Sequence, residues 1–112
     1  MLQRVGVTIE NYMTQLSARQ QVVASNIANA DTPGYKTKDV DFQSELALQM
    51  SGIKPTISEV SGLRTKNDGN NVDIDREARL LAENALKFNI ASNLARGVLL
   101  SVRKAIEDGK TS

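Results

Sequence analysis

Apolar side chains recur at seven-residue intervals in both end segments of this chain, and neither segment contains a proline. That spacing places side chains on one stripe of an α-helix, so it predicts two long helices, over 1–30 and 73–112. The segment between them, 31–72, holds both prolines and most of the glycines and is predicted to be a connector. The first stripe consists of Leu2, Ile9, Leu16, Val23 and Ala30; the second consists of Ile74, Leu81, Phe88, Ala95 and Val102, with Ala78, Ala85, Ser92, Leu99 and Ile106 beside it.

The two helices are expected to pair as an antiparallel, coiled-coil-like hairpin in a single structural domain, which makes the predicted fold class all-α. About 33 helical residues would extend roughly 50 Å, and a compact chain of this size has a radius of gyration of only about 13 Å. Neighbouring copies or partners are therefore expected to cover the apolar surface that one chain leaves open. The residues predicted to form the helix seam and the assembly contacts are Ile9, Leu16, Val23, Ile27, Leu81, Phe88, Leu99, Val102 and Ile106.

The ends and outer faces of the helices carry their own signals. Asp73 is placed to cap the second helix, Asp75 lies in the first turn where the helix dipole favours a negative charge, and Gly109 is expected to end that helix. Between residues 5 and 30 the only charges are Glu10 and Arg19, and most other polar residues are uncharged amides. Such a face could contact other proteins, because burying an amide costs less than burying an ion, or it could be an ordinary solvent-exposed surface. The pattern leaves both interpretations open.

The connector shows three weaker signals. Asp41 is placed to cap a short helix through about residue 50, and residues 56–60 alternate enough to predict a short extended strand. The run 67–71, rich in Asn and Gly, predicts a turn before the second helix.

Composition excludes several classes of function. The chain has no Cys and no His, which removes disulfides, thiolate or imidazole catalysis and the usual zinc and haem ligands. Its 14 basic and 13 acidic residues are evenly spread, so a nucleic-acid surface is not expected. No apolar run is long enough to span a membrane, and the first residues do not look like a secretory signal, so export would need another route. No cofactor and no small-molecule substrate are predicted.

Two pairs of aspartates, Asp39 with Asp41 and Asp73 with Asp75, raise the question of a metal or acid–base site. Each pair precedes a predicted helix, where carboxylates act as caps, and no third ligand is evident beside either. An EF-hand also fails, because aligning Gly69 with the invariant glycine of that loop puts Arg64 and Lys66 at acidic ligand positions. Helix capping accounts for both pairs.

The most informative run is residues 25–36, Ser-Asn-Ile-Ala-Asn-Ala-Asp-Thr-Pro-Gly-Tyr-Lys. Pro33 followed by Gly34 specifies a type II turn, because proline fixes φ and glycine accepts the positive φ that comes next. Physical reasoning alone describes this run as a well-made end to the first helix. The residues predicted to set the turn, called the signature turn below, are Asn26, Asn29, Asp31, Thr32, Pro33, Gly34 and Tyr35.

Residues 26–36 resemble the signature of the flagellar basal-body rod family, in which an Ala-Asn-x-x-Thr-Pro-Gly-Tyr-like run ends the amino-terminal helix. Two further blocks, 39–42 and 68–77, resemble a proximal rod member of that family more than its other rod or hook members. The resemblance covers both terminal helices and the turn, whereas about 46–66 matches no block.

The resemblance implies a structural, non-enzymatic subunit that polymerises through its terminal helices into the tubular rod of the bacterial flagellum, in the periplasm. It also implies partners, namely further copies, other rod proteins and the membrane ring with its adaptor, and export by the flagellar type III apparatus without a cleavable signal. The alternative from another class is a small helical adaptor or export chaperone that binds one partner helix in a groove. A third possibility, a carboxylate enzyme, would need an Asp pair to converge with another acid in a pocket.

Overall fold

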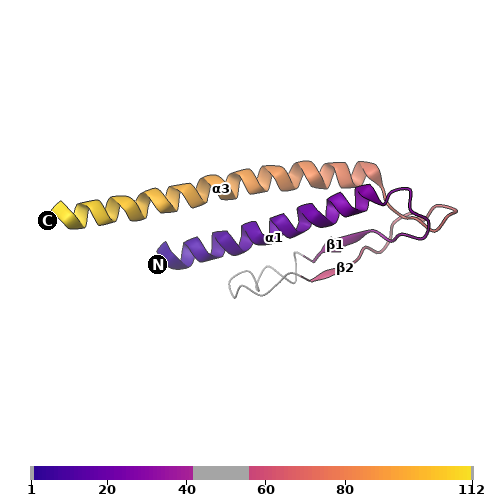
Figure 1. The fold of residues 1–112 in the computed structure, drawn as a ribbon, viewed down its shortest axis with the longest axis horizontal. Coiled ribbons are helices and arrows are strands. Elements are labelled where there is room, and N and C mark those ends of the chain that lie inside the picture. The colour runs from indigo at the N-terminus through magenta and orange to yellow at the C-terminus, as the bar shows by residue number, and fades with distance from the viewer. Residues whose placement is uncertain (1, 42–55, 112) are drawn as a thin grey trace.

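The computed structural model describes residues 2–41 and 56–111. Two helices dominate it: α1, Leu2–Ala28, has 27 residues, and α3, Ile74–Thr111, has 38. They lie side by side and run in opposite directions, and the carboxyl end of α3 projects past the amino terminus of α1 (Figure 1). The molecule is consequently a long, thin body with principal extents of 71 × 23 × 16 Å.

A small antiparallel sheet lies beside α1, near the end where α1 stops and α3 begins (Figure 1). It consists of β1, Lys38–Val40, and β2, Ile57–Glu59, with Asp39 opposite Ser58. The chain is therefore mostly helical, and the all-α prediction is corrected by the presence of this two-stranded sheet. The predicted strand at 56–60 contains β2, but β1 was not predicted, because three residues with two charges give no apolar alternation.

Other predicted boundaries differ from the structure in detail. The predicted short helix from Asp41 to about residue 50 falls mostly on 42–55, outside the described residues. Gly109 does not end α3, which continues to Thr111 because Gly109 keeps a helical backbone instead of the positive φ of a C-terminal cap. The turn at 67–71 is present, with Gly69 at a φ of 87° and its N–H donating to the carbonyl of Lys66.

The core of the molecule is narrow and follows the contact between the helices. Leu16 and Val23 of α1 are fully buried, and Ala91 of α3 is almost so. Val40 of β1 and Val72, just before α3, extend this core beneath the sheet and the loops. So few buried apolar side chains cannot cover two helices of this length, and polar side chains complete the contact.

Candidate functional site: a polar clasp and two apolar flanks

Asn26, near the end of α1, joins three separate parts of the chain. It is fully buried, and its Nδ2 donates to the carbonyl of Lys38 at 2.7 Å and to Oε1 of Glu77 at 3.1 Å. Its Oδ1 accepts from the hydroxyl of Tyr35 at 2.9 Å and from the backbone N–H of Lys38 at 3.1 Å. One amide therefore holds the signature turn, β1 and the first turn of α3 against α1.

The signature turn itself is a tight reversal. Gly34 has a φ of 76°, and the N–H of Tyr35 donates to the carbonyl of Thr32 at 3.2 Å, which is the geometry of a type II turn. Asn29 ends the helix by donating from its Nδ2 to the carbonyl of Ser25, and its Oδ1 accepts from the Thr32 hydroxyl. Asp31 and Pro33 are exposed.

The loop that precedes α3 packs directly on this turn through a second buried amide. Asn70 is fully buried and donates from Nδ2 to the carbonyls of Asn29 and Thr32, each at 2.8 Å. The N–H of Gly34 donates to the carbonyl of Asp68 at 2.9 Å, so the two turns also bond through their backbones. They approach so closely that a Cβ on Gly69 would lie 3.2 Å from the Cα of Gly34.

Ion pairs connect the same segments on the side of β1. Asp39 receives two hydrogen bonds from Arg19 of α1, both at 3.0 Å, and one from Arg76 of α3 at 3.2 Å. Arg76 also donates to Oε1 of Glu77 at 2.8 Å. Asp39 was expected to act as a helix cap, but it instead ties the connector to both helices. We call the group formed by Arg19, Asn26, Asp39, Asn70, Arg76 and Glu77 the polar clasp.

Glu77 has the most unusual environment in the clasp. Its side chain is fully buried, and its Oε2 has no hydrogen-bond partner. Burial raises the pKa of Glu77 above its ordinary value of 4.5, and the hydrogen bond from Asn26 and the charge of Arg76 lower it in part. The carboxyl group therefore takes up a proton more readily than an exposed glutamate does.

Asp73 and Asp75 mark the start of α3 as the sequence suggests. Oδ1 of Asp73 accepts from the N–H groups of Asp75 at 3.0 Å and Arg76 at 3.2 Å, which is N-cap geometry. Asp75 is exposed in the first turn.

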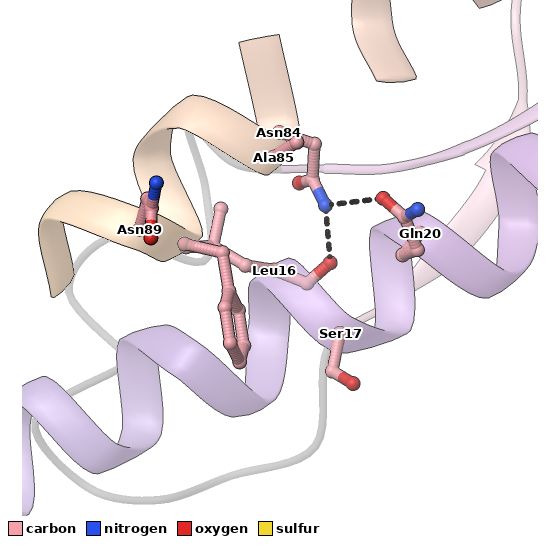
Figure 2. A pocket seen from close by; sticks show the side chains of 7 residues that line it. Leu16, Ser17, Gln20, Asn84, Ala85 and Asn89 are labelled. Carbon is pink, nitrogen blue, oxygen red and sulfur yellow. Dashed lines mark hydrogen bonds between the residues drawn. The ribbon is translucent and has the colours of Figure 1, made fainter. Parts of the chain in front are cut away.

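The line of α3 that faces α1 is polar or small at several positions. Glu77, Asn84 and Ala91, spaced by seven residues, are buried. Asn84 donates from Nδ2 to the carbonyl of Leu16 and to Oε1 of Gln20, both at 2.9 Å, whereas its own Oδ1 has no partner (Figure 2). The seven-residue rows of large apolar residues in the sequence lie beside this contact line instead of on it.

The predicted seam residues accordingly divide into three groups. Leu16 and Val23 are fully buried between the helices. Ile9, Leu81 and Val102 are half-buried. Ile27, Phe88, Leu99 and Ile106 are exposed in the single chain, by 36%, 39%, 56% and 55%. These last four therefore leave a large part of their apolar surface open in the single chain.

Two hollows lie in line on one side of the helix pair, and we call them together the groove. The first has a volume of about 340 Å³ and is lined by residues of both helices (Figure 2), namely Leu16, Ser17, Gln20, Asn84, Ala85, Phe88 and Asn89. The second, of about 470 Å³, lies nearer the amino terminus of α1 and is bordered by Val7, Met13, Ala95, Val98, Leu99 and Val102 among others. The groove is mostly apolar, so it suits a side-chain or helix surface better than a charged ligand.

On the opposite flank of α3, a row of large side chains is more than half exposed, and we call it the ridge. Leu86, Ile90 and Leu94 are 63%, 52% and 58% exposed. Two of its residues, Ile90 and Leu94, also line a hollow of about 150 Å³ with Ile9 and Tyr12 of α1. The described residues contain no group of three or more acidic side chains that could hold a metal ion. Neither described helix combines the length and apolarity that crossing a membrane requires.

A sequence model of the family described as "Flagella basal body rod protein" matches residues 10–36, which cover most of α1 and the signature turn. Relatives that align with four fifths or more of the chain at 30% identity or better are named as rod proteins. The chain therefore belongs to the flagellar basal body rod proteins.

The particular member that it is similar to is FlgB. The FlgB of Escherichia coli (strain K12) is 32% identical over 116 aligned residues, which cover 81% of this chain and 84% of the relative. The FlgB of Borrelia hermsii is 33% identical, covering 86% and 90%. The FlgB of Bacillus subtilis (strain 168) is 30% identical, covering 91% and 92%. These relatives are structural rod proteins of the flagellar basal body and not enzymes, which fits a non-enzymatic chain.

Sequence reasoning missed several residues of the site. Asn70 and Asn71 were noted only as turn formers, yet Oδ1 of Asn71 accepts from the N–H of Thr37 at 2.6 Å. Asn84 gave no signal beyond being a polar residue within a helix. Arg19 was noted only as one of two charges in its helix, and Glu77 only as part of the block 68–77. The seven-residue spacing of Glu77, Asn84 and Ala91 can be read from the sequence, but only the structure shows that this line faces α1.

Proposed function

We propose that this chain is a subunit of the proximal rod, which polymerises through its terminal helices into the tubular drive shaft of the bacterial flagellum. In this role it transmits torque, encloses the export channel, and contacts further copies, other rod proteins and the membrane ring with its adaptor. It acts in the periplasm after export through the flagellar type III apparatus. Within each subunit the two helices pair as a coiled-coil-like hairpin.

The observation that carries the proposal is the apolar surface left open along the helix pair. The ridge, the groove and Phe88, Leu99 and Ile106 are uncovered along most of α3. Monomeric proteins rarely expose continuous apolar surface of this kind, and assembly with neighbours is the simplest way to bury it.

The polar clasp, which lies where α1 ends and α3 begins, also supports a role as a repeating rod subunit. It fixes the direction in which the connector leaves the helix pair, because Asn26 of α1 bonds Lys38 and because Asp39 accepts from Arg19 of α1 and Arg76 of α3. A repeating assembly requires that every subunit present its connector at the same angle. The signature turn is the part of the chain that sets that angle.

The test is whether the chain is found in basal bodies. In flagellated cells that produce an epitope-tagged form as their sole copy, we expect motility and recovery of the tag in purified basal bodies. Removing the gene should abolish both the rod and motility. The adaptor or chaperone alternative instead predicts a soluble complex of fixed stoichiometry and no tag in basal bodies, and that result would reject the proposal.

A further inference from the structure

The backbone of β2 has an open edge. Hydrogen-bonded pairs alternate with non-bonded pairs along an antiparallel ladder, and the N–H of Val60 donates to the carbonyl of Thr37 across the two strands. Counting back from Val60, Ser58 faces β1 in the same way, whereas Ile57 and Glu59 turn their N–H and carbonyl groups away from β1. Among the residues that the structure describes, none bonds to these outward groups.

The other edge of the sheet is closed by a side chain. The N–H and the carbonyl of Lys38, which point away from β2, are both bonded by the amide of Asn26. Asn26 therefore takes the place of a neighbouring strand beside β1. β2 lies on the side of β1 away from α1 (Figure 1), and of the described helices and strands it contacts β1 alone. The sheet can consequently grow only at β2.

β2 is built as an accessible edge. All three of its residues are exposed, Ile57 by 52%. Its pairing with β1 is continuous, so Ile57–Glu59 contains neither the proline nor the bulge with which proteins commonly block an edge strand. A sheet of two short strands is marginal in water, and a third strand would complete it.

The side chains of β2 define the chemistry of such a third strand. Ile57 and Glu59 are two residues apart and therefore lie on the same face. Glu59 lies opposite Lys38 of β1, yet it takes part in none of the ion pairs between described residues. A basic residue on the added strand would meet this carboxylate, and an apolar residue two positions away would cover Ile57.

The described strands of a second copy do not supply the third strand of a repeating assembly. In each copy Asn26 closes the outer edge of β1, and pairing of β2 with another β2 is a two-fold contact that stops at a dimer. Resting on the proposed function, we propose that β2 binds an extended segment of a partner protein other than this chain. The segment adds to the sheet as a third strand, with a basic residue beside Glu59 and an apolar one beside Ile57.

Amide hydrogen exchange resolved at single residues tests the backbone part of this proposal. In the dilute purified chain, the amides of Ile57 and Glu59 should exchange quickly, and those of Ser58 and Val60, which face β1, more slowly. In basal bodies all four should be slow, with exchange at Ile57 and Glu59 reduced about tenfold or more.

Two substitutions of one residue separate strand pairing from simple burial. Ile57→Pro removes the outward N–H without removing a bond to β1, whereas Ile57→Ala trims the side chain and keeps the N–H. Each variant is produced in cells alongside an equal amount of tagged unsubstituted chain. Recovery from basal bodies should be about two- to tenfold lower for Ile57→Pro than for Ile57→Ala, as expected for the loss of one backbone hydrogen bond.

The charge of the added strand is tested in the same competition. Glu59→Lys would place like charge beside the basic residue of the partner and should lower recovery from basal bodies. Ser58→Lys, which adds a lysine on the opposite face of β2, is the matched control and should be recovered like the unsubstituted chain. Equal recovery of Glu59→Lys and Ser58→Lys would show that the occupant does not have the proposed chemistry.

The remaining outcomes separate this proposal from the one on which it rests. If the chain is present in basal bodies but Ile57 and Glu59 exchange as fast as in the free chain, no strand is added, while the rod function stands. Slow exchange with equal recovery of Ile57→Pro and Ile57→Ala would mean burial without strand pairing and would also overturn the proposal. Protection that appears in the purified chain as it dimerises at high concentration would make the occupant a second copy. Absence of the unsubstituted tagged chain from basal bodies would reject both the rod function and this contact.

Discussion

At the residue scale, buried asparagine side chains hold segments of this chain together by hydrogen bonds, where larger cores use apolar packing. Asn26 and Asn70 are fully buried, and each bonds backbone groups from other segments of the chain. An amide both donates and accepts, and burying it avoids the desolvation cost of burying an ion. These side chains therefore fix the positions of loops that have few apolar contacts.

The contact between the two turns makes a specific demand on Gly69. Both Gly69 and Gly62 have a positive φ, of 87° and 80°, so alanine at either should cost about 1–2 kcal/mol in backbone strain. At Gly69 the new Cβ would also lie 3.2 Å from the Cα of Gly34, whereas at Gly62 it would meet nothing within 4 Å. We expect Gly69→Ala to lower the free energy of unfolding clearly more than Gly62→Ala in denaturant titrations. Equal losses would show that the turns do not pack as described.

Glu77 gives the chain a pH dependence with a definite sign. Burial raises the pKa of Glu77 in the folded state above 4.5, so the folded chain holds this proton at a pH where the unfolded chain has released it. The stability that comes from this group is therefore full below about pH 4.5 and is lost as the pH rises through the folded-state pKa. Glu77→Gln removes that titration, so its melting temperature should rise relative to the unsubstituted chain as the pH increases from about 4.5 towards 7.

The matched control for Glu77→Gln is Glu83→Gln, on the exposed surface of the same helix. Its melting curve should follow that of the unsubstituted chain across the same pH range. Parallel pH profiles for all three proteins would contradict the assigned environment of Glu77.

At the element scale, the sequence was sufficient to predict both helices, the signature turn and β2, because periodicity, proline–glycine turns and alternation are local signals. It was insufficient for β1, which depends on pairing with β2 and on Arg19 and Arg76 holding Asp39. It also misplaced the contact line of α3. Glu77 and Asn84 carry no apolar signal, and their burial depends on partners in α1 that lie more than fifty residues away in the chain.

Asn84 should determine the register of the two helices. Its two hydrogen bonds to Leu16 and Gln20 form only in one alignment, while its unpartnered Oδ1 costs stability. We expect Asn84→Leu to maintain or raise the melting temperature but to let the helices slide. A Gly6→Cys/Val98→Cys pair, at positions that face each other across the helices, reports on register through its intramolecular disulfide.

The disulfide should form efficiently in the otherwise unsubstituted chain and less completely when Asn84→Leu is added. Asn89→Leu, one turn further along the exposed surface of α3, serves as the control and should leave the yield unchanged. If the disulfide forms completely in the Asn84→Leu variant, contacts other than those of Asn84 determine the register of the helices.

At the scale of the whole molecule, the chain is long for its size. Its radius of gyration is 18.5 Å, against about 13 Å for a compact chain of this length. The difference arises because two long helices, of 27 and 38 residues, lie side by side instead of folding into a compact body. Because α3 is longer than α1, the two helices cannot cover each other along their full lengths. The uncovered part is the carboxyl end of α3, which extends past the amino terminus of α1 (Figure 1).

That overhang leads to a prediction about where order depends on assembly. The side chains of 103–109 are all exposed, and an isolated helical segment shorter than about 12 residues is marginal in water. In the purified chain, hydrogen exchange should therefore be fast in a peptide covering 103–111 and slow in one covering 77–91, which contains Glu77, Asn84 and Ala91 at the contact with α1. In basal bodies both peptides should be protected, because neighbours would then cover the overhang. Strong protection of 103–111 in the dilute, monomeric chain would mean that α3 needs no neighbour to hold its end, which would contradict the expectation that assembly orders the overhang.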